Sequence, residues 1–377
     1  MANLHSALAC NLDANILQAS LPLLEAEQVD AIEWAFDTLY RTNKLPDWFD
    51  QLLRIYSDAG RLVGHGVFFS LFSGHWTADQ QAWLKHLKIL SSHYRFDHVT
   101  EHFGFMTGAD FHTGAPLSVP LNSSTLSIGK DRLKRIQEAA RCPVGLENLA
   151  FAYSLDDVKR QGDFLHQLIY PVNGFLILDL HNLYCQSHNF RLGYEQLLRL
   201  YPLDRVREIH LSGGSWEPAT SEPGRTVRRD THDEAVPTEL FGWLEKAIDQ
   251  CPNLKYVVLE QVGSGLRTEQ ARQGFARDFR QMKAIVKGKS NGLPSKLNTF
   301  LPGEPIVINE LPVEDAELFA QQRQLATILE SANDYQHARQ LLASSNLAGS
   351  DWLAEKWQPG MLETAIAIAQ KWRKGFS

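Results

Sequence analysis

Histidine, aspartate and glutamate recur in short motifs that end or directly follow apolar segments of the chain. In chain order, the motifs are Gly64-His65-Gly66, Glu101-His102, Leu146-Glu147-Asn148, Asp179-Leu180-His181-Asn182, Glu208-Ile209-His210, Asp230-Thr231-His232 and Glu260-Gln261. Acidic side chains are seldom buried unless they are paired with a cation or bind a metal. Imidazole and carboxylate groups without thiolate are ligands that suit iron, manganese or zinc. The motifs therefore predict a metal site.

The number of candidate ligands exceeds what a single ion uses. An ion of tetrahedral or octahedral geometry takes about four to six ligands, and the motifs supply more. Glu147, Asp179 and Glu260 would also repel one another in a shared cavity, which raises carboxyl pKa values unless cations are bound. We therefore expect a multinuclear site in which at least one carboxylate bridges two ions.

Each motif has an ordinary structural explanation when it is taken alone. His65 could be a core histidine, and Glu147 could pair with a lysine or an arginine. Asp230 and His232 could be solvated loop residues. All of these explanations would have to apply at once, at the same end of neighbouring strands, and we therefore favour the metal site.

Several other polar segments have more than one interpretation. The Ser-Gly-Gly-Ser run, 212–215, could cradle an anion through backbone N–H groups or only let the chain turn near the metals. The basic run 225–229 could steer an acidic peptide to the site or form a solvated loop. The pleat side of His98 is ambiguous. Three loop histidines are further candidates for the lining of the site: His75, His112 and His188.

The elements that must position these motifs alternate regularly up to about residue 287. Eight apolar, strand-like segments are separated by amphipathic segments whose apolar residues recur at helical spacing. Near-continuous apolar strands, such as 175–178 and 256–259, are typical of parallel strands covered on both sides. This order predicts an α/β fold, a (β/α)8 TIM barrel, whose catalytic groups come from the carboxyl ends of the strands. An open doubly wound sheet is disfavoured because no glycine-rich turn follows the first strand.

The chain changes character after the barrel. Residues 288–314 are rich in lysine, glycine, serine and proline and predict a linker. Helical patterns return over 315–377, which we expect to form a small C-terminal helical extension. The barrel itself, residues 1–287, is then the metal-dependent catalytic domain.

Composition argues against several classes of protein. The chain has 377 residues, 37 basic and 44 acidic side chains and a net charge of −7, as in a soluble globular protein. Mild acidity argues against nucleic-acid binding, which needs basic groups to neutralise phosphate. No apolar run is long enough to cross a membrane and the first residues lack a secretory signal, so we expect a cytoplasmic protein. The four cysteines form no CxxC pair and are expected to be reduced, buried thiols.

The motifs resemble those of the multinuclear non-heme iron-dependent oxidative enzymes, the (β/α)8 family that includes the methanobactin-biosynthesis oxidase. The resemblance covers about residues 5–287. It is carried by the order and spacing of Gly64-His65-Gly66-Val67, Glu101-His102, Leu146-Glu147-Asn148, residues 178–184, residues 208–213 and Asp230-Thr231-His232.

Carried over position by position, the resemblance implies a set of iron ligands in which Glu147 is the bridging one. The implied ligands are His65, His102, Glu147, Asp179, His210, Asp230, His232 and Glu260. The members expected to take part directly in catalysis are His65, His102, Glu147, Asp179, His210 and Glu260. On the sixth strand the family commonly reads Asp-x-Asn-Asn, and this chain has His181 in place of the first asparagine. Either His181 replaces an amide ligand, or Asn182 is the ligand with His181 beside it.

The resemblance implies an oxidoreductase of natural-product biosynthesis. The expected cofactors are two or three iron ions of mixed valence, with O2 as co-substrate. The expected substrate is a cysteine, or the adjacent backbone, of a ribosomally synthesised precursor peptide, which a dedicated partner protein presents. Two other functions stay open: a divalent-metal isomerase or phosphodiesterase with a xylose-isomerase-like barrel, and a non-catalytic scaffold that binds metal or peptide in a biosynthetic complex.

Overall fold

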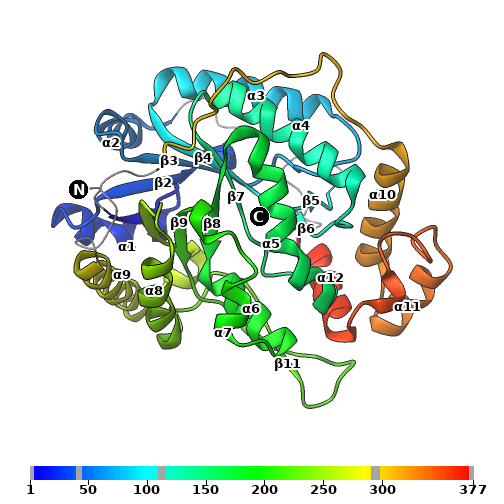
Figure 1. Cartoon of the computed structure of the whole chain (residues 1–377). Helices are drawn as coiled ribbons and strands as arrows, with labels where there is room; N and C mark the ends of the chain where they lie inside the picture. The colour runs from blue at the N-terminus through cyan, green and yellow to red at the C-terminus, as the bar shows by residue number, and fades with distance from the viewer. Residues whose placement is uncertain (1–3, 40–44, 109–115, 290–297, 373–377) are drawn as a thin grey trace.

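Eight parallel strands form a closed barrel in the structure, a computed structural model that describes residues 4–39, 45–108, 116–289 and 298–372. Their bounds are β1 His5–Ala9, β2 Ala31–Ala35, β3 Leu62–Gly66, β4 Phe96–His102, β7 Val144–Glu147, β8 Phe175–Asp179, β9 Val206–Leu211 and β12 Tyr256–Leu259. The strands follow one another around the barrel in this order (Figure 1). Pairing of β12 with β1 closes the barrel. The predicted (β/α)8 TIM barrel is confirmed.

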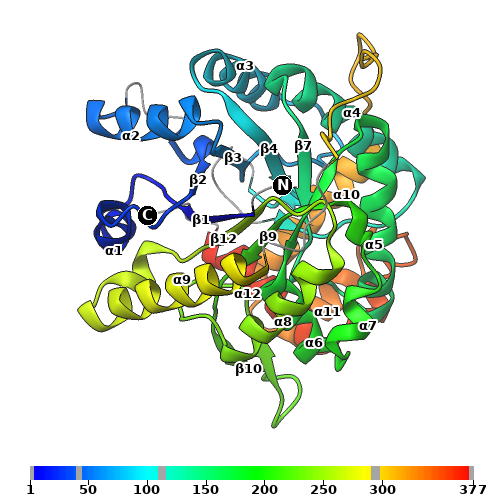
Figure 2. The same ribbon diagram turned by 60° about the vertical axis from the view of Figure 1, so that its left-hand side comes forward.

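Helices follow the strands and surround the barrel (Figure 2). Their bounds are α1 Ala14–Glu25, α2 Asp47–Asp58, α3 Ala78–His93, α4 Ser123–Ala140, α5 Leu155–Ile169, α6 Leu180–Phe190, α7 Tyr194–Leu198, α8 Thr238–Gln250 and α9 Glu269–Lys289. Local sequence explains where several of them begin. At the start of α3, the Thr77 hydroxyl accepts a hydrogen bond from the Gln80 N–H at 3.1 Å, and the Gln80 side chain accepts one from the Thr77 N–H. Such a capping box satisfies N–H groups that no helical carbonyl reaches.

The interior of the barrel contains an apolar part and a polar part. The apolar part includes a small cluster from β1, β2, β3 and β12: Ala7, Ala31, Val63, Tyr256 and Val258. On β9 the two-residue alternation of a strand turns Glu208 and His210 to the same side, and both are fully buried. Glu208 meets His98 of β4 inside the barrel. We call the end of the barrel formed by the carboxyl ends of the strands the mouth. Buried polar side chains thus extend from the mouth into the interior of the barrel.

Two short pairs of antiparallel strands lie at the mouth. One pairs β5 Phe105–Met106 with β6 Pro116–Leu117, and the other pairs β10 Trp216–Pro218 with β11 Thr226–Arg228. Neither was expected from the sequence, because strands of two or three residues carry almost no periodic signal. The second hairpin leads the chain directly into Asp230 and His232.

The described residues that come after α9 begin at Asn298 and lie against the opposite end of the barrel, which we call the floor. Phe300 is fully buried there, with its ring 5.6 Å from that of Phe175 and 5.7 Å from the Arg207 guanidinium. Further along, Arg132 of α4 donates a hydrogen bond to the carbonyl of Val313 at 2.9 Å. The segment therefore passes from the floor along α4 toward the mouth.

Three C-terminal helices, α10 Ala316–Ser331, α11 Tyr335–Ala343 and α12 Pro359–Trp372, pack against the mouth loops (Figure 1). The Gln322 side chain donates to the carbonyl of Phe72 at 2.7 Å, in the loop after β3. Trp357 stacks on Tyr153, in the loop after β7, with ring centroids 3.8 Å apart. The apolar core of the barrel continues into these helices without a break. The extension and the barrel therefore share one core.

Two expectations from composition can be compared with the structure. All four cysteines are buried and unpaired, as expected. Within the described ranges, no helix has the length and apolar character that spanning a membrane requires.

Candidate metal centre

Strand register brings the sequence motifs together at the mouth. In the pairing of β4 with β7, His102 lies beside Glu147, and in the pairing of β8 with β9, Asp179 lies beside His210. Residues in register on neighbouring parallel strands turn their side chains to the same side of the sheet. Residues 102 and 210, far apart in the chain, therefore face one space.

A first group is made by His65, His102 and Glu147, whose ligand atoms lie within 4.8 Å of one another. Oε2 of Glu147 is 3.3 Å from Nε2 of His102 and 3.6 Å from Nε2 of His65. The Thr100 hydroxyl donates to the carbonyl of Gly64 and lies 2.8 Å from Nδ1 of His65. Because the Thr100 hydroxyl donates its proton to Gly64, the Thr100 oxygen accepts the Nδ1–H of His65. The lone pair of His65 is then on Nε2, which faces Glu147.

A second group, Glu147, Asp179 and His210, is buried and shares Glu147 with the first. Oε1 of Glu147 is 4.0 Å from Nδ1 of His210, whereas its Oε2 faces the first group. Oδ2 of Asp179 is buried without a hydrogen-bond partner among the described residues, and Nδ1 of His210 lies 3.2 Å from Oε2 of Glu260. Orphaned buried acceptors are costly unless something binds them. Glu147 thus presents one oxygen to each group, which is the arrangement of a bridging carboxylate.

A third group contains Glu33, His210 and Glu260. Oε2 of Glu33 lies 3.1 Å from Nε2 of His210, and Oε2 of Glu260 lies 3.2 Å from Nδ1 of the same ring. Glu33 was missed from the sequence because its strand motif holds a single acidic residue with no histidine nearby. The available signal was its place in an apolar strand, β2, in which every residue is buried.

Asp230 and His232 form the outer edge of the centre. Nε2 of His232 is 3.0 Å from Oδ1 of Asp230, and its Nδ1 is 3.6 Å from Oε2 of Glu260. His232 has a left-handed backbone, with φ of 54°, which is uncommon for residues other than glycine and is found disproportionately at functional sites. The structure therefore brings both loop residues to the strand-end residues.

The structure distinguishes His181 from Asn182. Both belong to the first turn of α6, so the expectation that the sixth strand extends to Asn182 was wrong: β8 ends at Asp179, whose side chain caps the helix. Nδ1 of His181 is 2.8 Å from Oδ1 of Asp230, and its Nε2 accepts from Nε of Arg228 at 3.2 Å. Nδ2 of Asn182 donates to the carbonyl of Asn148 at 2.7 Å and to Oε1 of Glu147 at 3.2 Å, and its Oδ1 is buried without a hydrogen-bond partner among the described residues. The oxygen of Asn182, and neither nitrogen of His181, is available to a cation.

Most of the basic run 225–229 lies in the hairpin strand β11 rather than in a solvated loop. Arg228, the last residue of that strand, and Arg229, which follows it, are both buried. Arg229 pairs with Glu217 at 2.5 Å, and Arg225 pairs with Glu222 at 2.5 Å. The charges of these guanidinium groups are therefore used inside the protein.

The glycines of the run 212–215 allow close packing of the hairpin. A Cβ on Gly214 would lie 2.2 Å from the carbonyl oxygen of Arg229 and 2.9 Å from the His181 ring. This supports the interpretation that these glycines let the chain turn near the metal centre.

The electrostatics of the described residues fit a cation. Burial raises the pKa of Asp179 to about 7, with the charge of Asp230 acting in the same direction. Burial also raises the pKa values of Glu147 and Glu33 well above their ordinary range. Burial lowers the pKa of His102 to about 4, so its imidazole is neutral near pH 7 and can offer a lone pair. Without a metal, Asp179, Glu147 and Glu33 are therefore unfavourable when ionised, and a bound cation would relieve that cost. The neighbouring His232 and His210 instead lower the pKa values of Asp230 and Glu260.

The remaining candidate histidines lie away from the centre. His75 pairs with Glu314 at 2.5 Å, and the His188 ring packs on that of Trp216 with centroids 4.8 Å apart. His98 lies inside the barrel, bonded to Glu208. His112 lies outside the described residues.

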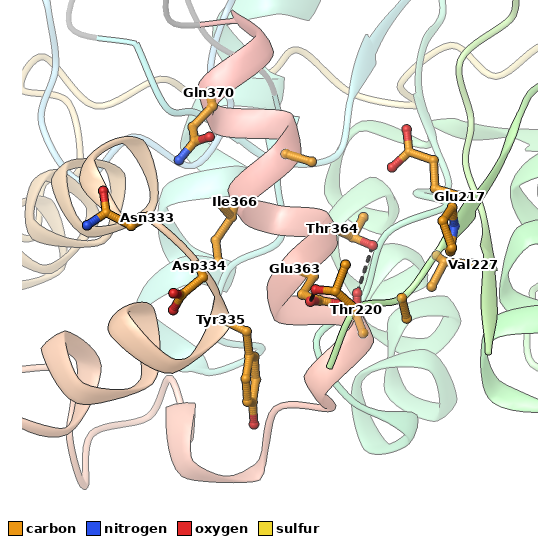
Figure 3. A pocket seen from close by; sticks show the side chains of 14 residues that line it. Glu217, Thr220, Val227, Asn333, Asp334, Tyr335, Glu363, Thr364, Ile366 and Gln370 are labelled. Carbon is orange, nitrogen blue, oxygen red and sulfur yellow. Dashed lines mark hydrogen bonds between the residues drawn. The ribbon is translucent and has the colours of Figure 1, made fainter. Parts of the chain in front are cut away.

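A separate cavity of about 280 Å³ lies between the β10–β11 hairpin and the C-terminal helices. Figure 3 shows Glu217 and Val227 of the hairpin on one side, Asp334 and Tyr335 on the other, with α12 between them. None of the sequence-predicted ligands lines it. The cavity is therefore distinct from the metal centre.

Comparisons with known proteins add the family. A family model described as RiPP precursor modification enzyme MbnB/TglH/ChrH matches residues 19–264. A UPF0276 protein of Caulobacter vibrioides is 27% identical over 184 residues, which are 48% of this chain and 62% of that protein. A UPF0276 protein of Acaryochloris marina is 31% identical over 154 residues, which are 40% of this chain and 54% of that protein. The match thus spans less than two thirds of the length of these relatives.

Among solved structures, a xylose isomerase domain protein from Planctomyces limnophilus is similar with a TM-score of 0.50 and 15% identity, covering 77% of this chain and 99% of that one. This likeness shows the barrel fold alone. The family match includes every strand end of the candidate centre, from Glu33 to Glu260, and excludes α10–α12. Because it covers more than half of the chain, the protein belongs to the MbnB/TglH/ChrH family of RiPP precursor modification enzymes.

Proposed function

We propose that the chain is an O2-dependent multinuclear iron oxidase that modifies a cysteine, or the adjacent backbone, of a ribosomally synthesised precursor peptide. The observation that carries the proposal is the position of Glu147, whose two oxygens face two separate ligand groups. Family membership supplies the precursor peptide as the class of substrate.

Two sets of side chains would hold the ions. His65, His102 and Oε2 of Glu147 would hold one, and Oε1 of Glu147, Asp179 and His210 would hold the other. Oδ1 of Asn182 would add a further ligand to the second set, because this oxygen is buried and has no hydrogen-bond partner among the described residues. Glu260, Asp230 and His232, together with Glu33, would complete the second set or hold a third ion.

Iron in this centre would supply the oxidising chemistry, with O2 as the electron acceptor and the peptide cysteine or backbone as the electron donor. The protein's own contribution is to hold the donors and to keep the inner part dry. Thr100 keeps the lone pair of His65 directed at Glu147. Asp179, Asn182 and His210 are buried, whereas His102 and His232 are about a quarter exposed. Substrate would therefore approach from the side of His102 and His232.

We also propose that a dedicated partner protein presents the peptide substrate and that the protein acts in the cytoplasm. The C-terminal helices would support the substrate entrance, because they pack on the loops after β3 and β7 that surround the mouth.

The experiment combines oxygen consumption with peptide mass spectrometry. Iron-loaded full-length protein is incubated with a cysteine-containing precursor peptide and a partner protein that are chosen from the products of neighbouring genes. We expect O2 uptake that matches a mass change at the cysteine over many turnovers. A product formed without O2 would favour the isomerase-like alternative, and stoichiometric peptide binding without any product would favour a scaffold.

A further inference from the structure

A chain of buried, hydrogen-bonded side chains runs from the barrel floor to His210. Nε2 of His98 is bonded to Oε2 of Glu208, and both residues are fully buried. The other oxygen of Glu208, Oε1, lies 2.9 Å from Nε2 of His210. On the floor side, Nε of Arg207 donates to Nδ1 of His98 at 3.2 Å. Arg207, His98 and Glu208 thus connect the floor with the candidate metal centre.

Arg207 sets the direction of these hydrogen bonds. A guanidinium only donates, so Nδ1 of a neutral His98 is an acceptor and its proton is on Nε2, where it is donated to Glu208. If His98 is protonated, its Nδ1–H has Asp97 Oδ2 at 3.0 Å, and Nε2–H still donates to Glu208. In both cases Glu208 has Oε1 free to accept the Nε2–H of His210. Oε2 of Glu33 also lies 3.1 Å from Nε2 of His210, so this N–H is held between two carboxylates. Nδ1 of His210 is then the nitrogen that faces the centre, where it lies 3.2 Å from Oε2 of Glu260.

At the barrel floor, Arg207 and His98 of this hydrogen-bonded series are held in place by further contacts. Nη2 of Arg207 donates to Oδ2 of Asp97 at 2.7 Å, and the guanidinium lies 5.8 Å from the centre of the Phe175 ring. The rings of Phe175 and Tyr256 enclose His98 edge-on, with centroids 4.7 and 5.4 Å from its own. His98 therefore has little freedom to turn its ring.

We propose that His98 is a positioning residue which, with Arg207 and Glu208, fixes the orientation of His210 so that its Nδ1 faces the metal centre. The inference rests on the proposed function only in taking His210 as a ligand. Partners that orient a ligating histidine commonly change metal affinity by about 10–100-fold when they are removed.

The first test measures Co²⁺ binding to the full-length, metal-free protein by visible absorption. His98→Phe removes both ring nitrogens, whereas His98→Gln keeps an acceptor for Arg207 and a donor for Glu208. Tyr256→Phe changes the neighbouring ring of the same layer and is the matched control. We expect about 10–100-fold weaker binding and an altered spectrum for His98→Phe, and near wild-type values for the other two. Arg207→Met breaks the same chain at the floor and is expected to act like His98→Phe, should that variant not fold.

The second test needs no metal. Imidazole N–H protons that are buried in hydrogen bonds exchange slowly and are seen by ¹H–¹⁵N NMR. The His210 signal, identified by its loss in His210→Ala, is expected to be an Nε2–H that loses its protection in His98→Phe. A folded His98→Phe protein with wild-type Co²⁺ affinity and spectrum, or with a protected His210 signal, would overturn the inference. If the wild type binds no Co²⁺ but shows the protected Nε2–H that depends on His98, the proposed function fails while the positioning of His210 stands.

Discussion

Asp179 divides its two carboxylate oxygens between a helix and the candidate metal centre. Oδ1 accepts a hydrogen bond from the backbone N–H of Asn182 at 2.5 Å, which caps α6. Oδ2 is buried and has no hydrogen-bond partner among the described residues. The residue therefore stabilises the fold through one atom and leaves the other for a cation.

This division predicts how Asp179→Asn changes the metal-free protein. The amide oxygen keeps the cap and the substitution removes the buried charge. The folded pKa of Asp179 is about 7, against 3.8 when unperturbed. Because the pKa is higher in the folded state, protonated Asp179 does not destabilise the fold below about pH 4. Its ionisation lowers the free energy of unfolding progressively as the pH rises from about 4 to 7. We expect Asp179→Asn to raise the free energy of unfolding at pH 7 by roughly 2–4 kcal/mol.

Urea unfolding of the EDTA-treated proteins at pH 5 and pH 7.5 measures this effect. The gain from Asp179→Asn is expected to be larger at pH 7.5, although the variant binds metal poorly. Equal gains at the two pH values would show that Asp179 is not a strained carboxyl in the metal-free protein.

The second prediction distinguishes His181 from Asn182. His181→Gln is expected to keep the full complement of ions with affinity lowered by up to about tenfold, because both ring nitrogens are used by Asp230 and Arg228. Asn182→Leu, of similar volume, is expected to lose at least one ion per chain. Metal analysis after gel filtration gives both numbers, and loss of an ion in His181→Gln alone would assign the ligand to the histidine.

The third prediction concerns the bridging residue. Glu147→Gln removes the charge that both ligand groups share. It is expected to weaken metal binding by more than about 100-fold, which is a larger effect than the loss of a residue that only orients a ligand. Glu101→Gln is the matched control, because Glu101 is buried too but belongs to none of the three ligand groups: its Oε1 accepts the backbone N–H of His102 at 3.0 Å and its Oε2 lies near Gly66. Isothermal titration with Fe²⁺ under nitrogen compares the two variants. Full metal content in Glu147→Gln would mean that the bridge is misplaced.

The fourth prediction tests the attachment of the C-terminal helices. Trp357 is buried and stacks on Tyr153, with ring planes 11° apart. Trp357→Ala is expected to cost about 3–5 kcal/mol of unfolding free energy, as other truncations of buried aromatic residues do. Trp48→Ala, at a site with 52% exposure, should cost less than about 1 kcal/mol. If both variants unfold at the same denaturant concentration, the helices do not share a core with the barrel.

The barrel could be predicted from the sequence because its signals are local and repeated. Apolar strands such as Phe175–Asp179 and amphipathic helices such as Leu155–Ile169 each carry their own periodicity. The carboxyl ends of parallel strands share one edge, so placing His102 beside Glu147 needed no knowledge of side-chain conformation.

What could not be predicted depends on contacts between distant segments. Arg228 and Arg229 look like exposed basic residues, but the hairpin buries them beside His181 and Glu217. Residues 298–314 have the composition of a linker and are largely exposed, but Phe300 is buried by its contacts with Phe175 and Arg207 at the barrel floor. Glu33 stands alone in its strand, so nothing in its neighbourhood indicated that it would meet His210.

The most direct measurement of the central claim is the iron content of the full-length protein after reconstitution with Fe²⁺ under nitrogen and removal of unbound metal, with Mössbauer spectroscopy of the same sample. We expect two or more iron ions per chain and spectra that contain at least two distinct sites. Fewer than one ion per chain, or one site of ordinary mononuclear character, would contradict a multinuclear centre built around Glu147.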